Sequence, residues 1–191
     1  MSDIKPFRQY DEHDVINLFT FNGTTGTNGV LLQAGKLVDI HTGWKSDSDP
    51  VDLSSSASGL SLTGKALSTT WSLSAKVQAA DAGDQPIGMT LVAMRDEDEN
   101  GEKLLYNPRK AAEMGVVIPG QSIPLATRGL FILKSDDTSG WTNVTFSAGQ
   151  LLYAGASGEI TTSSNSGANK LVGTALGAKD ANGYALIKLD I

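Results

Sequence analysis

Residues 96–102, Asp-Glu-Asp-Glu-Asn-Gly-Glu, have the residue types of the first half of a calcium-binding loop. Asp96, Asp98 and Asn100 stand at the first, third and fifth positions of such a loop, and Gly101 stands at the sixth. Carboxylate and amide oxygens at this spacing can surround Ca²⁺ on one side of a tight turn. The twelfth position, however, is Asn107, where the loop requires a bidentate glutamate.

The residues on either side of this acidic segment favour a simpler structure. Residues 91–94 and 103–106 are apolar enough to form strands, whereas a calcium loop of this type lies between helices. We therefore favour an acidic, solvated turn between two strands. The sequence predicts no metal and no other cofactor, and Asp96, Asp98 and Asn100 are the candidate ligands in the calcium alternative.

Catalytic chemistry has few possible residues in this chain. The two histidines are His13, within an acidic segment at 11–14, and His41, and there is no cysteine, so a serine or cysteine nucleophile has few possible bases. No Gly-x-Ser-x-Gly turn, Walker loop or dinucleotide fingerprint is present. A catalytic pair of carboxylates, as in glycosidases, is an open alternative, because the sequence does not give the distance between two acids in the folded chain. We predict no catalytic residue and no enzymatic activity.

Composition and charge narrow the class of partner. The 191 residues carry a formal charge of −6, and this acidity argues against nucleic acid or an anionic membrane as a partner. No apolar run reaches the ~20 residues that span a bilayer. The N-terminus lacks the apolar segment of a signal peptide, so we expect synthesis in the cytoplasm of a host cell.

Short apolar runs separated by Gly, Ser, Asn and Asp predict strands joined by tight turns. Four such runs lie at 146–155, 158–162, 171–178 and 183–189. Asn182-Gly183 predicts a hairpin with a type I′ turn, which needs two residues that tolerate positive φ. The predicted class is therefore all-β, as a small barrel or sandwich, and residues 107–115 add one short helix between an Asn cap and a terminal Gly.

This C-terminal pattern resembles a known family. The order Ala-Gly-Gln-Leu-Leu-Tyr-Ala-Gly at 148–155, Gly-Glu-Ile-Thr-Thr-Ser at 158–163, Leu-Val-Gly-Thr-Ala-Leu-Gly-Ala at 171–178 and Tyr-Ala-Leu-Ile-Lys-Leu at 184–189 is similar to the C-terminal module of capsid decoration, or cement, proteins of tailed bacteriophages. Residues 10–19 also resemble the N-termini of some phage members. The resemblance implies a structural virion protein that binds the outer capsid surface, contacts the major capsid protein, stabilises capsomer contacts and forms a homotrimer.

The chain contains two pairs of similar segments, which indicate two related hairpin units. Residues 30–40 echo 151–162, and residues 86–93 echo 171–178 through the frame apolar-Gly-x-x-Leu-x-Ala. An Asn-Gly turn follows each copy. Chance similarity is the alternative, because short β-sequences draw on few residue types. We expect a β-domain at 30–191, with an insertion at about 41–82.

Residues 1–29 are expected to form either an arm that packs on a neighbouring subunit or a first strand at 15–21. The predicted capsid or subunit contacts are apolar residues of this segment together with one tryptophan: Ile4, Phe7, Tyr10, Val15, Leu18, Phe19 and Trp44. Trp44, Trp71 and Trp141 could instead form a platform for sugar rings. A carbohydrate- or receptor-binding module of a phage tail or fibre is therefore the alternative function.

Overall fold

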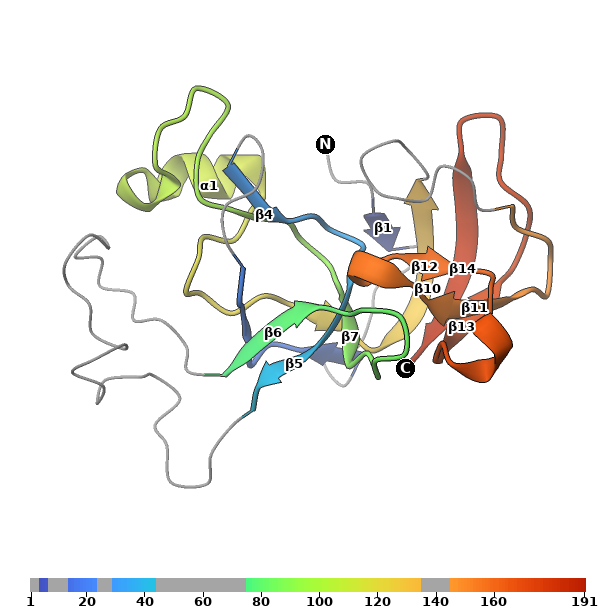
Figure 1. The fold of residues 1–191 in the computed structure, drawn as a ribbon. Helices are drawn as coiled ribbons and strands as arrows, with labels where there is room; N and C mark the ends of the chain where they lie inside the picture. The colour runs from blue at the N-terminus through green and yellow to red at the C-terminus, as the bar shows by residue number, and fades with distance from the viewer. Residues whose placement is uncertain (1–3, 7–13, 24–28, 44–74, 135–144) are drawn as a thin grey trace.

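The computed structural model describes residues 4–6, 14–23, 29–43, 75–134 and 145–191 (Figure 1). In these ranges the chain is built of strands with one α-helix, which confirms the predicted all-β class. No helix in the described ranges is long and apolar enough to cross a membrane. The strands are β1 (Ile4–Pro6), β2 (Val15–Ile16), β3 (Thr20–Phe21), β4 (Val30–Leu32), β5 (Leu37–Thr42), β6 (Lys76–Ala79), β7 (Gly88–Thr90), β8 (Met94–Arg95), β9 (Leu125–Ala126), β10 (Arg128–Lys134), β11 (Leu151–Ala154), β12 (Ile160–Thr161), β13 (Leu171–Ala175) and β14 (Tyr184–Asp190).

The C-terminal strands form a six-stranded sheet, sheet A, in the order β1-β10-β14-β13-β11-β12 (Figure 1, right). Every neighbouring pair is antiparallel. In β14 the side chains alternate, with Ala185, Ile187 and Leu189 buried and Lys188 and Asp190 exposed. This period of two is what a strand with one face on a core requires.

The hairpin between β13 and β14 turns at the predicted Asn-Gly pair but with another geometry. Gly183 has a φ of 82°, whereas Asn182 is not among the residues with positive φ. The predicted type I′ turn, which needs positive φ at both residues, is therefore wrong. The Asp180 carboxylate instead accepts the backbone N–H groups of Asn182 and Tyr184, both at 2.8 Å, and so fixes the turn through its own side chain.

A second six-stranded sheet, sheet B, has the order β2-β9-β7-β5-β6-β3. Its neighbours are antiparallel except for β3 and β6, which are parallel. Strands β4 and β8 pair separately beside it. Since β2 and β3 come from residues 15–21, the predicted single strand is divided between the two edges of this sheet.

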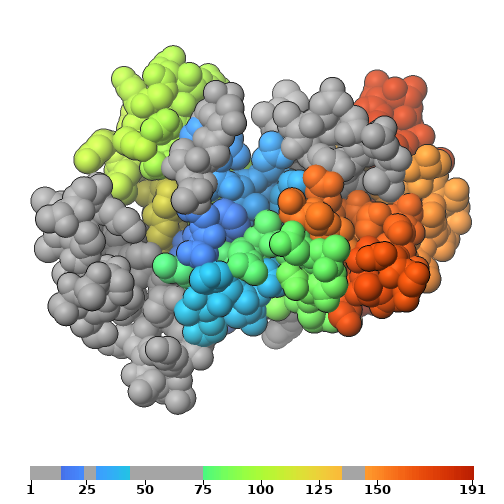
Figure 2. All heavy atoms as spheres, in the orientation of Figure 1, coloured from blue at the N-terminus to red at the C-terminus, as the bar shows by residue number. Residues whose placement is uncertain are grey.

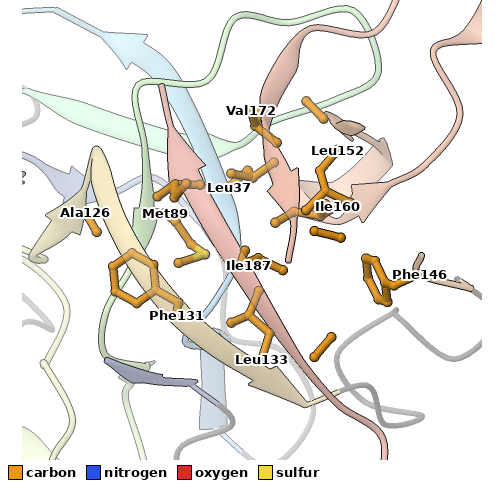
Figure 3. Close-up of a cluster of buried hydrophobic side chains, with 14 of the residues drawn as sticks. Leu37, Met89, Ala126, Phe131, Leu133, Phe146, Leu152, Ile160, Val172 and Ile187 are labelled. Atoms are coloured by element: carbon orange, nitrogen blue, oxygen red, sulfur yellow. The ribbon is translucent and has the colours of Figure 1, made fainter. Parts of the chain in front are cut away.

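Two cores lie on the two faces of sheet B. In the first, Leu37, Met89 and Ala126 of sheet B pack against sheet A (Figure 3). The sheet A side chains of this core include Phe131, Leu133, Leu152, Ile160, Val172 and Ile187. The second core lies on the opposite face of sheet B and contains Phe19, Leu32, Val38, Ala75, Val77, Met94, Ile123 and Leu125. Sheet B is thus covered on both faces, while sheet A has one buried face.

The predicted helix is present as α1 (Pro108–Met114). The Asn107 side chain accepts the Lys110 N–H at 3.3 Å, Pro108 occupies the first turn and Gly115 ends the helix with a φ of 64°. The prediction of a strand at 104–106 is wrong, because these residues form a 3-10 turn. Leu104 of this turn packs with Ala111 and Ile118 in a small third core. Of the apolar run at 146–155, only residues 151–154 form a strand, and Phe146 packs in the first core outside any strand.

The two sheets contain the same five-stranded arrangement twice. The first unit has the order β2-β9-β7-β5-β6 and the second has the order β10-β14-β13-β11-β12. Their strands follow one another along the chain in the same sequence, and all neighbours within both units are antiparallel. The structure therefore repeats a five-stranded arrangement, which is larger than the two hairpin units predicted from sequence.

Hydrogen bonds fix which residues of the two units correspond. The Gly35 N–H donates to the Thr90 carbonyl at 2.7 Å, and Thr90 N–H donates back to Lys36 at 2.9 Å. Gly149, Ala175 and Gln150 repeat this pattern at 2.8 Å in both bonds. Accordingly, Ala-Gly-Lys-Leu-Val at 34–38 corresponds to Ala-Gly-Gln-Leu-Leu at 148–152.

This correspondence corrects part of the predicted repeat. Residues 86–93 and 171–178 match as expected, with Gly88 and Gly173 at the same position of β7 and β13. Residues 30–35 do not match 151–155, because β5 rather than β4 is the counterpart of β11. The turn at 100–101 has no counterpart at 182–183, because the strand that corresponds to β14 is β9, at residues 125–126.

Candidate functional site

The predicted N-terminal contact residues are placed in different environments. Val15 lies in β2 and is partly exposed, Leu18 is 56% exposed, and Phe19 is only 7% exposed within the second core. Ile4 lies in β1, whose backbone pairs with β10. Phe7, Tyr10 and Trp44 lie outside the described residues, as do Trp71 and Trp141. Leu18 is therefore the most exposed described side chain of the predicted set.

The acidic turn is organised by Asp98, which is only 2% exposed. Its carboxylate accepts the backbone N–H groups of Asn100 and Glu102, both at 2.8 Å, and also the Lys110 ammonium of α1. The Lys103 Nζ lies 2.7 Å from carboxylate oxygens of both Asp96 and Glu97. Calcium at the predicted ligands would have to compete with two lysines, and the described residues contain no group of three or more His, Asp or Glu placed to hold a metal.

The Asp98 contacts join the turn to the helix and set the charge state of the carboxyl group. The hydrogen bond from Lys110, followed by that from the Glu102 N–H, lowers the pKa of Asp98 from 3.8 to about 2. The same contact raises the pKa of Lys110. The buried carboxylate thus stays ionised and holds the 3-10 turn, α1 and the acidic turn together as one small substructure.

We expect Asp98 to add to the acid sensitivity of the fold. Because the folded-state pKa is lowered, the unfolded chain binds the proton more readily, so the contribution of Asp98 is complete well above pH 3.8 and is lost as pH falls toward 2. Asp98→Asn should therefore show a smaller loss of Tm between pH 5 and pH 2 than the wild type, as followed by circular dichroism. Lys110→Met should flatten the profile in the same direction, whereas wild-type-like profiles for both variants would contradict the assignment.

The described histidine has no acidic partner of the kind a catalytic base needs. The His41 Nδ1 lies 2.9 Å from the Thr42 Oγ1 on an exposed strand. His13 lies outside the described residues. The described structure therefore does not assemble a nucleophile, base and acid around His41.

The outward face of sheet A is a further surface, which sequence analysis missed. Strand register places Leu151, Thr174, Lys188 and Leu130 side by side across four strands, with Tyr153 and Leu171 in the next row. On β14 and β10, two further rows of the same face hold Leu186 beside Ile132 and Asp190 beside Arg128. We call this set the outer face. Its signal in the sequence is the continuous apolar run at 130–133, because in an antiparallel strand such a run means that both faces are apolar.

Comparison with known proteins supplies the class of protein. Residues 108–190 match the model of a family described as phage cement protein. The matched segment is less than half of the chain and holds α1 and all strands of the second unit. No curated protein and no solved structure matches the chain.

The match confirms the resemblance predicted from the C-terminal residues. It indicates a structural protein of a phage virion, and the family is a structural rather than a catalytic one. The all-β fold agrees with this class.

Proposed function

We propose that this protein binds the outer surface of a phage capsid and stabilises the contacts between neighbouring capsomers. The observation that carries the proposal is the match of residues 108–190 to the phage cement family. Its partner would be the major capsid protein, and its own copies would associate as a homotrimer. Function of this kind depends on surface complementarity and needs no bond to be made or broken.

Each contact between this protein and the shell needs to bury only a small area. A stable protein interface buries more than about 1,000 Å² in total, and several weaker contacts can act together when copies are linked by symmetry. A trimer that bridges adjacent capsomers would gain this advantage. Within residues 1–29, β1 pairs with sheet A and β2 and β3 lie at the edges of sheet B, so we propose that this segment completes the β-domain of its own chain.

The test is reconstitution on capsids of the same phage that were assembled without this protein. Light scattering should give the mass of a trimer for the purified protein. Added to capsids, the protein should bind to a fixed number of sites and raise the temperature at which the shells break. Absence of saturable binding, or binding without any gain in shell stability, would contradict the proposed function.

A further inference from the structure

We infer that the outer face of sheet A is the surface through which this protein docks on the capsid shell. This inference rests on the proposed function and specifies the contact. The occupant to which it commits is a protein surface with an apolar part and an acidic part side by side.

The part of the outer face formed by β11 and the start of β13 is apolar and open. Leu151 is 46% exposed and Leu171 is 52% exposed, and Tyr153, which pairs with Leu171, is partly exposed beside them. Large apolar side chains that gather on one face mark contact sites more often than scattered ones do. Figure 2 shows the C-terminal segment, in orange and red, forming one end of the molecule.

The charged residues of the outer face lie on β10 and β14, and their net charge is opposite in sign to that of the chain as a whole. Among the described residues of the outer face, Arg128 and Lys188 are cations and Asp190 is an anion. Asp190 contacts both Arg128 at 3.0 Å and Lys188 at 3.7 Å, so one carboxylate is shared by two cations. A net positive face on a chain of charge −6 is complementary to an acidic partner surface.

The repeat shows what this face of the unit does elsewhere in the chain. Leu37 corresponds to Leu151, and Met89 corresponds to Thr174, by strand register. Leu37 and Met89 are fully buried, because their face of sheet B packs against the inner face of sheet A. The two units thus stack head to tail, with one face of the first unit against the opposite face of the second. The outer face of sheet A corresponds to the face of the first unit that packs on sheet A, but no sheet of the described residues covers it.

The head-to-tail stack also argues against a second copy of this chain as the occupant. To continue the stack, the outer face would have to meet the inner face of another unit. In the second unit, the face opposite the outer face is covered by sheet B. In the first unit, the face turned away from sheet A is covered by the residues of the second core. Because both are filled, a second copy of this chain cannot continue the stack, and the inference commits to a different protein, the capsid shell.

The position and size of the face fit a shell contact. All of its residues fall within 108–190, the segment that matches the cement family. Four strands at ~4.8 Å spacing and a strand length of ~20 Å give roughly 400 Å². This is less than the ~800 Å² per partner of a standard interface, so we expect a contact that becomes strong only when several copies bind together.

The test compares three variants on capsids that lack this protein. Leu151→Glu with Leu171→Glu places two acids in the apolar part of the face and should weaken capsid binding at least tenfold, with the mass in solution unchanged and the Tm lowered by about 8 °C at most. Leu151→Thr with Leu171→Thr keeps strand-forming residues and decides the result if the glutamates unfold the protein. Ile40→Glu, at an exposed strand position of sheet B, is the matched control and should bind like the wild type.

The outcomes separate the inference from the proposed function. Binding by the wild type together with undiminished binding by a folded face variant would overturn the inference and leave the proposed function standing. A face variant that changes the mass in solution would identify a contact between copies and also overturn it. A wild type that does not bind capsids would overturn the proposed function itself.

Discussion

Gly173→Ala is expected to lower the free energy of unfolding by about 3 kcal/mol, the upper part of the range for overpacked interiors. Gly173 lies in β13 between β11 and β14, and both of its neighbours are hydrogen-bonded strands. A Cβ at this position would meet the carbonyl oxygen of Lys188 in β14. Since this obstacle is backbone, no side chain can rotate away, and the sheet itself would have to shift.

Gly177 supplies the matched control for this prediction. A Cβ there meets nothing within 4 Å, and neither glycine has the positive φ that would add backbone strain. Gly177→Ala should change the free energy of unfolding by less than about 0.5 kcal/mol. For a chain of this size, the Gly173 effect corresponds to a fall in Tm of roughly 6–12 °C. Equal Tm values for the two variants would show that the close approach of β13 and β14 is relaxed in solution.

The repeat adds an intermediate case. Gly88 occupies the corresponding position of β7, where a Cβ would lie 3.0 Å from the Leu125 Cβ and 3.1 Å from the Ala126 carbonyl oxygen. The obstacle is less close than at Gly173. Gly88→Ala should therefore fall between the other two variants, as measured by urea unfolding.

Sequence patterns predicted the local elements of this fold better than their partners. Asn107, Pro108 and Gly115 define α1 because capping depends on neighbours within one turn. Likewise, the apolar runs at 130–133 and 171–175 correspond to strands. The pairing of β2 with β9 joins residues about a hundred positions apart, and no local pattern specifies it. The same limit hid the Asp98–Lys110 contact, which depends on where α1 packs.

The candidate site shows a related limit. An apolar residue in a strand can belong to a core or to a contact surface, and its neighbours in sequence do not decide which. Phe19 and Leu18 are adjacent, yet the first packs in the second core and the second is exposed. Leu37 and Leu151 have the same sequence context, Ala-Gly-Lys/Gln-Leu, and again only one is buried. The stacking of one sheet on the other decides between these outcomes.

This pair of leucines provides the second large prediction. Leu37→Ala is expected to lower the free energy of unfolding by about 3 kcal/mol, within the 2–5 kcal/mol typical of buried leucines, because its side chain is fully buried between the sheets. Leu151→Ala removes the same atoms at the corresponding position of the repeat, where the side chain is 46% exposed, and should cost less than about 1 kcal/mol.

The comparison holds strand position, turn and substitution constant, so the difference between the two variants measures the burial of one face of the unit. Urea unfolding of the free protein gives both values. Equal losses would mean that Leu151 is covered in the free protein, and the outer face would then not be open to a partner. If Leu151→Ala has little effect on the free energy of unfolding but strongly weakens capsid binding, Leu151 contacts the shell. The face that packs on sheet A in the first unit would then correspond to the face that packs on the shell in the second unit.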